Sequence, residues 1–131
     1  MPLYRIHDTE PVLGVPTWAR KDYDRWTKRM DAQDLDAIMG EFDRLIELRM
    51  QTQDLDRQIH TAGWIPGSDW IGTVWEPIYE KAALQEPGDA AMCFGLLCFL
   101  AFSRRDETWY VGKFELHGKD IGSNTYFMPT R

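Results

Sequence analysis

Apolar side chains recur at helical spacing through the first half of the chain. Trp18, Trp26 and Met30 are separated by multiples of four, with charged residues of both signs between them. This spacing predicts an amphipathic helix whose N-cap is Thr17, just after Pro16. Because the apolar stripe of such a helix faces the core, we expect Trp18 and Trp26 to be buried. The intervening charges indicate a solvated face and not a binding patch.

A second, longer helix is predicted over residues 35–61, with Asp34 as its N-cap. Its apolar positions from 38 to 59 step by about 3.5 residues, the coiled-coil value. Two interpretations stay open: an arm that pairs with another subunit, or one helix that packs on its own chain and breaks near Thr52. The arm would form a dimer interface through Leu48, Thr52, Leu55 and Ile59.

The segment from 63 to 89 is rich in aromatic residues and turn signals. Pro66 and Gly67 indicate a turn, and Thr73 with Glu76 resembles a capping box. We therefore expect an irregular aromatic loop that leads into a short helix ending near Leu84. The following turn ends at Asp89, which is predicted to cap the next element.

Residues 90–103 are apolar on every side, so their periodicity does not separate a helix from a strand. The length of the run, its Ala, Leu and Met content and the preceding Asp89 favour a buried helix. Cys93 and Cys98 lie within it and are expected to be buried thiols. The run is too short to span a bilayer.

The C-terminal part of the chain has the pattern of a β-hairpin. Residues 108–116 alternate as a strand, 117–120 are predicted to turn, and 121–128 return as the partner. Residues 3–6 fit a short edge strand. We therefore expect an α+β fold in one domain, residues 1–131, mainly helical with about four helices and a small C-terminal antiparallel hairpin.

Composition excludes several classes of protein. The chain has 131 residues, 44% of them hydrophobic, which is too apolar for a disordered chain. Its net charge of −6 argues against nucleic-acid and anionic-membrane binding.

No secretory signal is evident, so a cytoplasmic location is expected. His7, His60 and His117 are too far apart for a metal site, and no cofactor motif is present.

Charge and indole side chains are concentrated in one short stretch. Residues 61–90 hold five acidic groups and one basic group, together with three tryptophans. Carboxylates beside indole faces suit a cation, such as a cationic small molecule or a basic protein segment. The candidate ligand-binding residues are Trp64, Asp69, Trp70, Trp75, Glu76, Tyr79 and Glu80. The function predicted from these features is a non-catalytic binding module that forms a homodimer through its long helix.

Two other interpretations use the same residues. In the first, the indoles are core residues that hold an irregular loop, and the acids cap helices. Alternatively, a small acid–base or metal-assisted enzyme would use carboxylates that share a helix face, with a histidine and a further carboxylate from the flanking loop. That set is Glu76, Glu80, His60 and Asp69.

Overall fold

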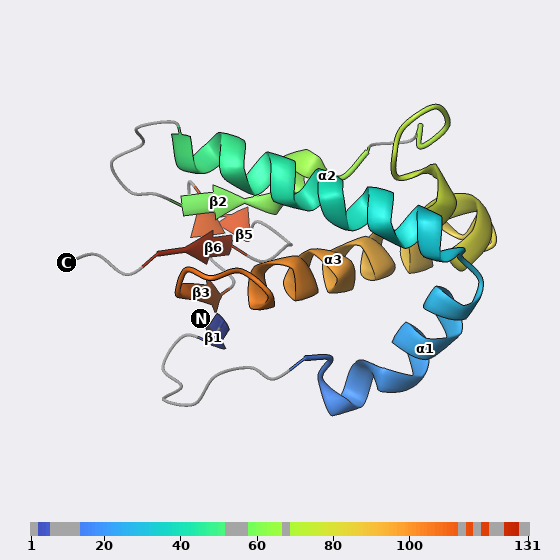
Figure 1. Ribbon diagram of the computed structural model, residues 1–131, viewed down its shortest axis with the longest axis horizontal. Helices are drawn as coiled ribbons and strands as arrows, with labels where there is room; N and C mark the ends of the chain where they lie inside the picture. The colour runs from blue at the N-terminus through green and yellow to red at the C-terminus, as the bar shows by residue number, and fades with distance from the viewer. Residues whose placement is uncertain are drawn as a thin grey trace.

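A computed structural model describes residues 3–5, 14–51, 58–66, 69–112, 115–116, 119–120 and 125–128. The fold is α+β, as predicted, with a central helix that contacts two other helices and a mixed sheet. Figure 1 shows helix α3 in the middle, with α2 along one side, α1 on the other and the sheet at its C-terminal end. No helix in these ranges is long and apolar enough to cross a bilayer.

The first helical segment consists of a 3₁₀ turn, η1 (Thr17–Ala19), followed by α1 (Arg20–Lys28). Thr17 is not the cap: the N-cap is Pro16, which offers no side-chain hydrogen bond. Trp26 is buried as predicted, but Trp18 is 76% exposed. Trp18 lies in the 3₁₀ turn that precedes α1, so the α-helical spacing that buries Trp26 does not extend to it.

Helix α2 (Ala32–Gln51) begins before Asp34 and ends earlier than predicted. Asp34 lies in the first turn, where its Oδ2 accepts a hydrogen bond from Asp31 N–H at 3.1 Å, so it is not the N-cap. The apolar positions near its centre, such as Phe42, are buried against the protein's own core.

The prediction of helix is wrong for residues 58–60, which form strand β2 (Gln58–His60). Ile59 lies opposite Tyr126 in the sheet and is only 3% exposed. The helical seam therefore ends before Ile59, because pairing with a distant strand overrides the local apolar spacing. Thr52 and Leu55, two other members of the expected seam, lie outside the described residues.

The buried run is helix α3 (Pro87–Ser103), which confirms the favoured prediction. Its N-cap is Glu86, not Asp89: the Glu86 side chain accepts a hydrogen bond from Gly88 N–H at 3.0 Å. Before α3 come a 3₁₀ turn, η2 (Thr61–Trp64), and one turn of π-helix, η3 (Ile78–Ala82). As predicted, the η3 segment ends just before Leu84.

The main sheet has the strand order β1-β3-β6-β2. β3 and β6 pair antiparallel, which confirms the predicted hairpin partners, and β1 is the expected edge strand, parallel to β3. The expected turn at 117–120 is partly wrong, because 119–120 pair with 115–116 as a second small sheet, while 117–118 lie outside the described residues. The strands not yet bounded are β1 (Leu3–Arg5), β3 (Trp109–Gly112), β4 (Glu115–Leu116), β5 (Lys119–Asp120) and β6 (Thr125–Phe127).

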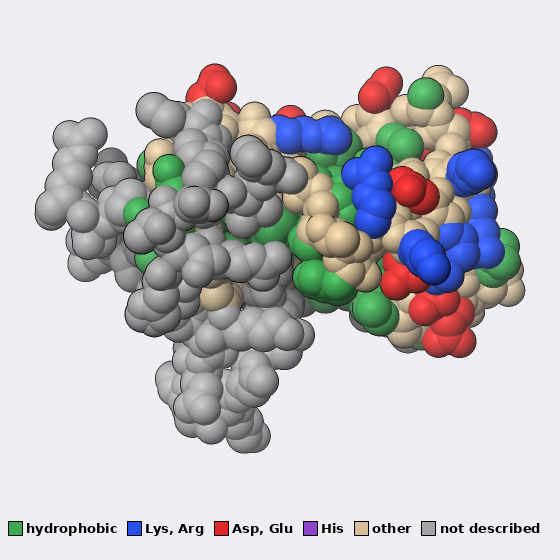
Figure 2. Space-filling model, turned by 90° about the horizontal axis from the view of Figure 1, so that it is seen from below, with side chains coloured by type: hydrophobic (Ala, Val, Ile, Leu, Met, Phe, Trp, Pro, Cys, Tyr) green, Lys and Arg blue, Asp and Glu red, His purple; other side chains and the backbone are tan. Residues whose placement is uncertain are grey.

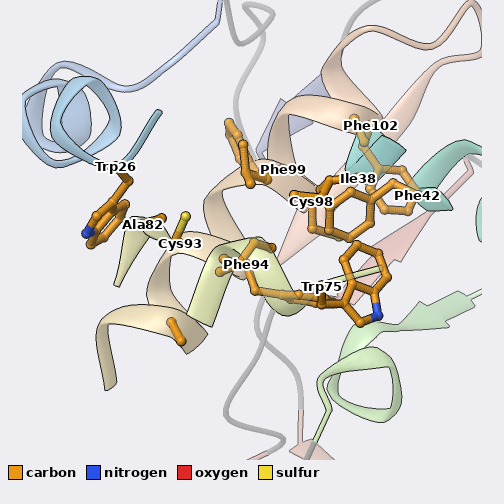
Figure 3. Close-up of a cluster of buried hydrophobic side chains, with 14 of the residues drawn as sticks. Trp26, Ile38, Phe42, Trp75, Ala82, Cys93, Phe94, Cys98, Phe99 and Phe102 are labelled. Atoms are coloured by element: carbon orange, nitrogen blue, oxygen red, sulfur yellow. The ribbon is translucent and has the colours of Figure 1, made fainter. Parts of the chain in front are cut away.

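Aromatic rings join the helices to the sheet. Phe102 of α3 stacks on Tyr126 of β6 at 3.7 Å between centroids and meets Trp109 of β3 edge-on at 4.9 Å. Further along α3, Phe94 meets Phe42 of α2 at 5.1 Å. Figure 3 shows this continuous cluster, which extends along α3 to Trp26 of α1. Ring packing of this kind fixes the relative positions of the helices.

Candidate functional site

A hollow of about 390 Å³ lies between the start of α2 and the segment that leads into η3. The beginning of α2 contributes Asp34 and Ala37, and η3 contributes Glu80 and Lys81. Both charged and apolar side chains line the hollow. The lining residues are Asp34, Ala37, Thr73, Val74, Glu76, Pro77, Glu80 and Lys81.

The turn before η3 contains the two residues of the predicted capping box, but its hydrogen bonds differ from that motif, in which Thr73 Oγ1 would accept from Glu76 N–H and Glu76 from Thr73 N–H. Thr73 Oγ1 accepts a hydrogen bond from Trp75 N–H at 3.2 Å, and Glu76 Oε2 accepts one from Gly72 N–H at 3.3 Å. Gly72 has a φ of +81°, a left-handed conformation that glycine adopts without strain. These contacts hold the Glu76 side chain on the side of the turn that faces the hollow.

The wide turn of η3 explains why both Glu80 and Lys81 line the hollow. Ala83 N–H donates to the Ile78 carbonyl at 2.9 Å, the i→i+5 bond of a π-turn. Glu80 and Lys81 both belong to this turn, and both line the hollow with Glu76. The turn ends at Leu84 and Gln85, which have φ values of 51° and 67°.

Lys81 already pairs with one of the carboxylates in the hollow. Its Nζ lies 2.7 Å from Asp34 Oδ2 and 3.3 Å from Asp31 Oδ2. The hydrogen bond from Lys81 lowers the pKa of Asp34, and the bond to Asp34 raises the pKa of Lys81. Glu80 Oε2 accepts a hydrogen bond from Gln85 Nε2 at 2.8 Å. Three carboxylates face one ammonium, so the hollow is electronegative.

The predicted site residues divide between this hollow and the core. Glu76 and Glu80 line the hollow. Trp70 and Trp75 are only 4% and 6% exposed. The Trp75 ring lies 4.7 Å from that of Phe42 and 4.8 Å from that of Phe94, as Figure 3 shows.

The remaining predicted residues do not line the hollow either. The Trp64 ring stacks over Phe102 at 6.4 Å, and the Tyr79 ring stacks on Trp70 at 6.1 Å. Asp69 is exposed, and its Oδ1 accepts a hydrogen bond from Ile71 N–H at 3.1 Å. The faces of the indoles are therefore occupied by other rings of the core, and the acids of the hollow are not covered by a π-face.

The sequence analysis missed Asp34 and Lys81 as site residues. Asp34 has the local pattern of a helix cap, and Lys81 is the one basic group in an acidic stretch. No local signal shows that the two meet, because 46 intervening residues separate them and only the tertiary fold brings them to 2.7 Å. The wide turn of η3 is also not predicted by helical periodicity.

Of the residues proposed for acid–base or metal chemistry, Glu76 and Glu80 line the hollow, whereas Asp69 does not. In the described ranges, no group of three His, Cys, Asp or Glu side chains is placed to hold a metal ion. The side chain of His60 lies outside the described residues. Burial raises the pKa of the Cys93 thiol to about 12 and that of Cys98 further, which suits unreactive core thiols.

The two members of the expected dimer seam that the structure describes, Leu48 and Ile59, differ in exposure. Leu48 is 51% exposed on α2, whereas Ile59 is buried in β2. Helix α2 therefore does not present the four seam residues as one continuous stripe.

Comparisons of the chain with protein-family models, curated proteins and solved structures give no match. The function of this protein is therefore inferred from the geometry and charge of the hollow.

Proposed function

We propose that this protein is a non-catalytic binding module whose hollow takes a basic side chain of a partner protein. The observation that carries the proposal is that acidic and apolar side chains line the same hollow. The carboxylates of Asp34, Glu76 and Glu80 share the hollow with the apolar side chains of Ala37, Val74 and Pro77. A lysine or arginine needs both, because its methylene stem packs on apolar surface while its charged head meets acids.

The size of the hollow agrees with this use. About 390 Å³ is within the range of sites for small organic groups and accommodates one long side chain. The indoles that would surround a free amine are packed in the core, so the hollow alone offers charge and a modest apolar wall. A protein partner supplies additional contacts around the inserted side chain. Ile71, two residues before Thr73 in the chain, is exposed and offers apolar area for such contacts.

Lys81 acts as the resident cation of the hollow. It neutralises Asp34 and leaves the carboxylates of Glu76 and Glu80 to an incoming charge. Removing Lys81 is therefore expected to strengthen the binding of a cation, whereas removing Glu76 or Glu80 weakens it.

The test is a titration of the ¹⁵N-labelled protein with a short arginine peptide, followed by amide chemical shifts at low salt. Each of Glu76→Gln and Glu80→Gln is expected to weaken binding by about three- to fivefold, the size of one partly exposed ion pair. Lys81→Gln is expected to tighten it several-fold. The control Asp106→Asn removes an exposed carboxylate outside the hollow and leaves the affinity unchanged.

A peptide with glutamine in place of arginine separates charge recognition from non-specific contact. The proposal is wrong if both peptides bind equally well, or if Glu76→Gln and Asp106→Asn have the same effect.

A further inference from the structure

Helix α1 presents a basic face to solvent at the same end of the molecule as the hollow. Residues 20–29 contain five basic side chains and two acidic ones. Lys21 and Lys28, seven positions apart, lie on the face opposite the buried Trp26. Trp18, three residues before Lys21, is the most exposed large apolar side chain among the described residues. Figure 2 shows Lys and Arg side chains gathered over this end, with acidic ones between them and hydrophobic ones alongside.

Most other charges of this helix have partners within the chain. Arg20 pairs with Asp24 at 3.5 Å, and Arg25 pairs with Asp22 at 3.0 Å. In the part of the chain that the structure describes, Lys21 and Lys28 form no ion pair. The face thus combines two uncompensated ammonium groups with an exposed indole, which together define a surface for an anionic, partly apolar partner. We name this surface, Trp18 with Lys21 and Lys28, the α1 face.

We infer that the partner is a second copy of this chain, in which the hollow of one copy receives the α1 face of the other. The inference rests on the proposed function, since it names the source of the basic side chain. Charge complementarity carries it: the α1 face has unpaired cations, and the hollow has three carboxylates against one lysine. Lys21 or Lys28 supplies the inserted cation. Trp18 lies at the end of the α1 face and adds apolar contact area beside it.

The positions of the two surfaces allow a closed dimer. The end of α1 is tied to η3, because Arg29 Nη1 donates to the Ala82 carbonyl at 2.8 Å. Lys81 of η3 in turn pairs with Asp31 and Asp34 at the start of α2. Both surfaces therefore lie at one end, and a two-fold axis places each α1 face on the hollow of the other copy. The same contact then forms twice, and no open chain results.

The expected dimer is weak and depends on salt. Helix α1 has nine residues, so it is about 13 Å long and covers only part of a stable interface. Exposed ion pairs contribute most of the attraction, and these are screened as the Debye length shortens. Sedimentation velocity over a range of protein concentrations should show a dimer at about 50 mM salt that dissociates at about 500 mM.

Two charge-reversal variants test the contact. One carries Lys21→Glu with Lys28→Glu, and the other carries Glu76→Lys with Glu80→Lys. Each is expected to be monomeric alone at low salt, because its own two surfaces now repel. Mixed in equal amounts, they are expected to form a heterodimer, since both contacts then join opposite charges.

The controls keep the result interpretable. A variant with Arg44→Glu and Arg104→Glu changes the same number of exposed basic residues outside both surfaces and should dimerise like the unaltered protein. Circular dichroism confirms that each variant is folded. If the Glu76→Lys substitution unfolds the turn at Gly72, Glu80→Lys alone replaces it, because among the described residues Glu80 bonds to a side chain, that of Gln85, and not to the backbone of that turn.

A dimer that survives both reversals but is lost in Leu48→Glu would place the interface on α2 and overturn the inference. A protein that stays monomeric at low salt would also overturn it. If the hollow nevertheless binds the arginine peptide, the proposed function stands and only the identity of the partner is wrong. If neither the peptide nor a second copy binds, both fail.

Discussion

Trp75 lies between the rings of Phe42 and Phe94, at 4.7 Å and 4.8 Å, and is almost fully buried. Trp75→Ala removes a large side chain from this position and leaves a cavity that the surrounding helices cannot fill. We expect a loss of about 3–5 kcal/mol in the free energy of unfolding. Urea denaturation followed by far-UV circular dichroism measures it.

Trp18→Ala is the matched control for that substitution. The same residue type is removed from an exposed position, so the free energy of unfolding should change by less than about 0.5 kcal/mol. A loss as large as that of Trp75→Ala would show that Trp18 is part of the core and would remove the apolar part of the α1 face.

Single residues also show where sequence patterns work. Trp26 and Trp109 are buried where helix and strand spacing predict, because each lies on the inner face of its element. The prediction for Trp18 is wrong because this residue lies in the 3₁₀ turn before α1, outside the helix whose spacing was extended to it. For Trp64, Trp70 and Trp75, sequence spacing does not distinguish a core aromatic from a ligand-facing one, since both uses need the same residue types.

At the scale of elements, Arg105 joins the end of α3 to α2. Its guanidinium pairs with Asp43 at 3.4 Å, with Glu47, and with Glu107 at 2.9 Å, and its side chain is only 9% exposed. Trp109 Nε1 also donates to Glu107 at 3.3 Å. This network holds the exit of α3 against α2 and the start of β3.

The network predicts a pH dependence of stability. Burial of Glu107 opposes its ionisation, but hydrogen bonds from Arg105 and Trp109 outweigh burial and hold its pKa below the usual value of 4.5. A lowered pKa in the folded state stabilises the protein above the unfolded value, and this contribution is lost as pH falls through the folded value. We expect the Glu107→Gln variant to be less stable at neutral pH.

Acidification should reduce that difference. Urea denaturation of both proteins between about pH 7 and pH 3 is the measurement. The unaltered protein loses stability more steeply below about pH 4.5 than Glu107→Gln, and the two profiles converge. Parallel profiles would show that Glu107 has no lowered pKa.

The elements differ in how well the sequence predicts them. Helix α3 is predictable from the length and the Ala, Leu and Met content of its apolar run, and the pairing of β3 with β6 from the alternation along residues 108–116. The end of α2 is not predictable from the sequence. Ile59 continues the apolar spacing of the helix, yet it lies in β2, where its partner Tyr126 comes from the far end of the chain. Long-range pairing of this kind leaves no local trace.

At the scale of the whole molecule, the hollow also depends on contacts between segments that are far apart in the sequence. Spacing predicts Glu76 and Glu80 on one face, since residues four apart are neighbours on a helix. The hollow itself needs Asp34 and Ala37 from α2, and the turn of η3 that carries Lys81. It forms only when α2 and η3 are placed together, so the sequence predicts two of its three acids and none of its shape.

The arrangement of charge over the whole molecule is the basis of the functional account. An electronegative hollow and the basic α1 face lie at one end of a chain whose net charge is −6. Net charge alone indicates only a mildly acidic protein. We propose that the separation of the two signs into neighbouring surfaces provides both a site for a basic side chain and a source of one.

The most direct test of the central claim locates a bound arginine side chain by paramagnetic relaxation. A short arginine peptide with a nitroxide label is added to the ¹⁵N-labelled protein, and its glutamine counterpart is the control. The account predicts that the amide signals of residues 34–37 and 73–81 broaden most, only with the arginine peptide and only at low salt. Broadening centred elsewhere, or equal broadening by both peptides, would contradict it.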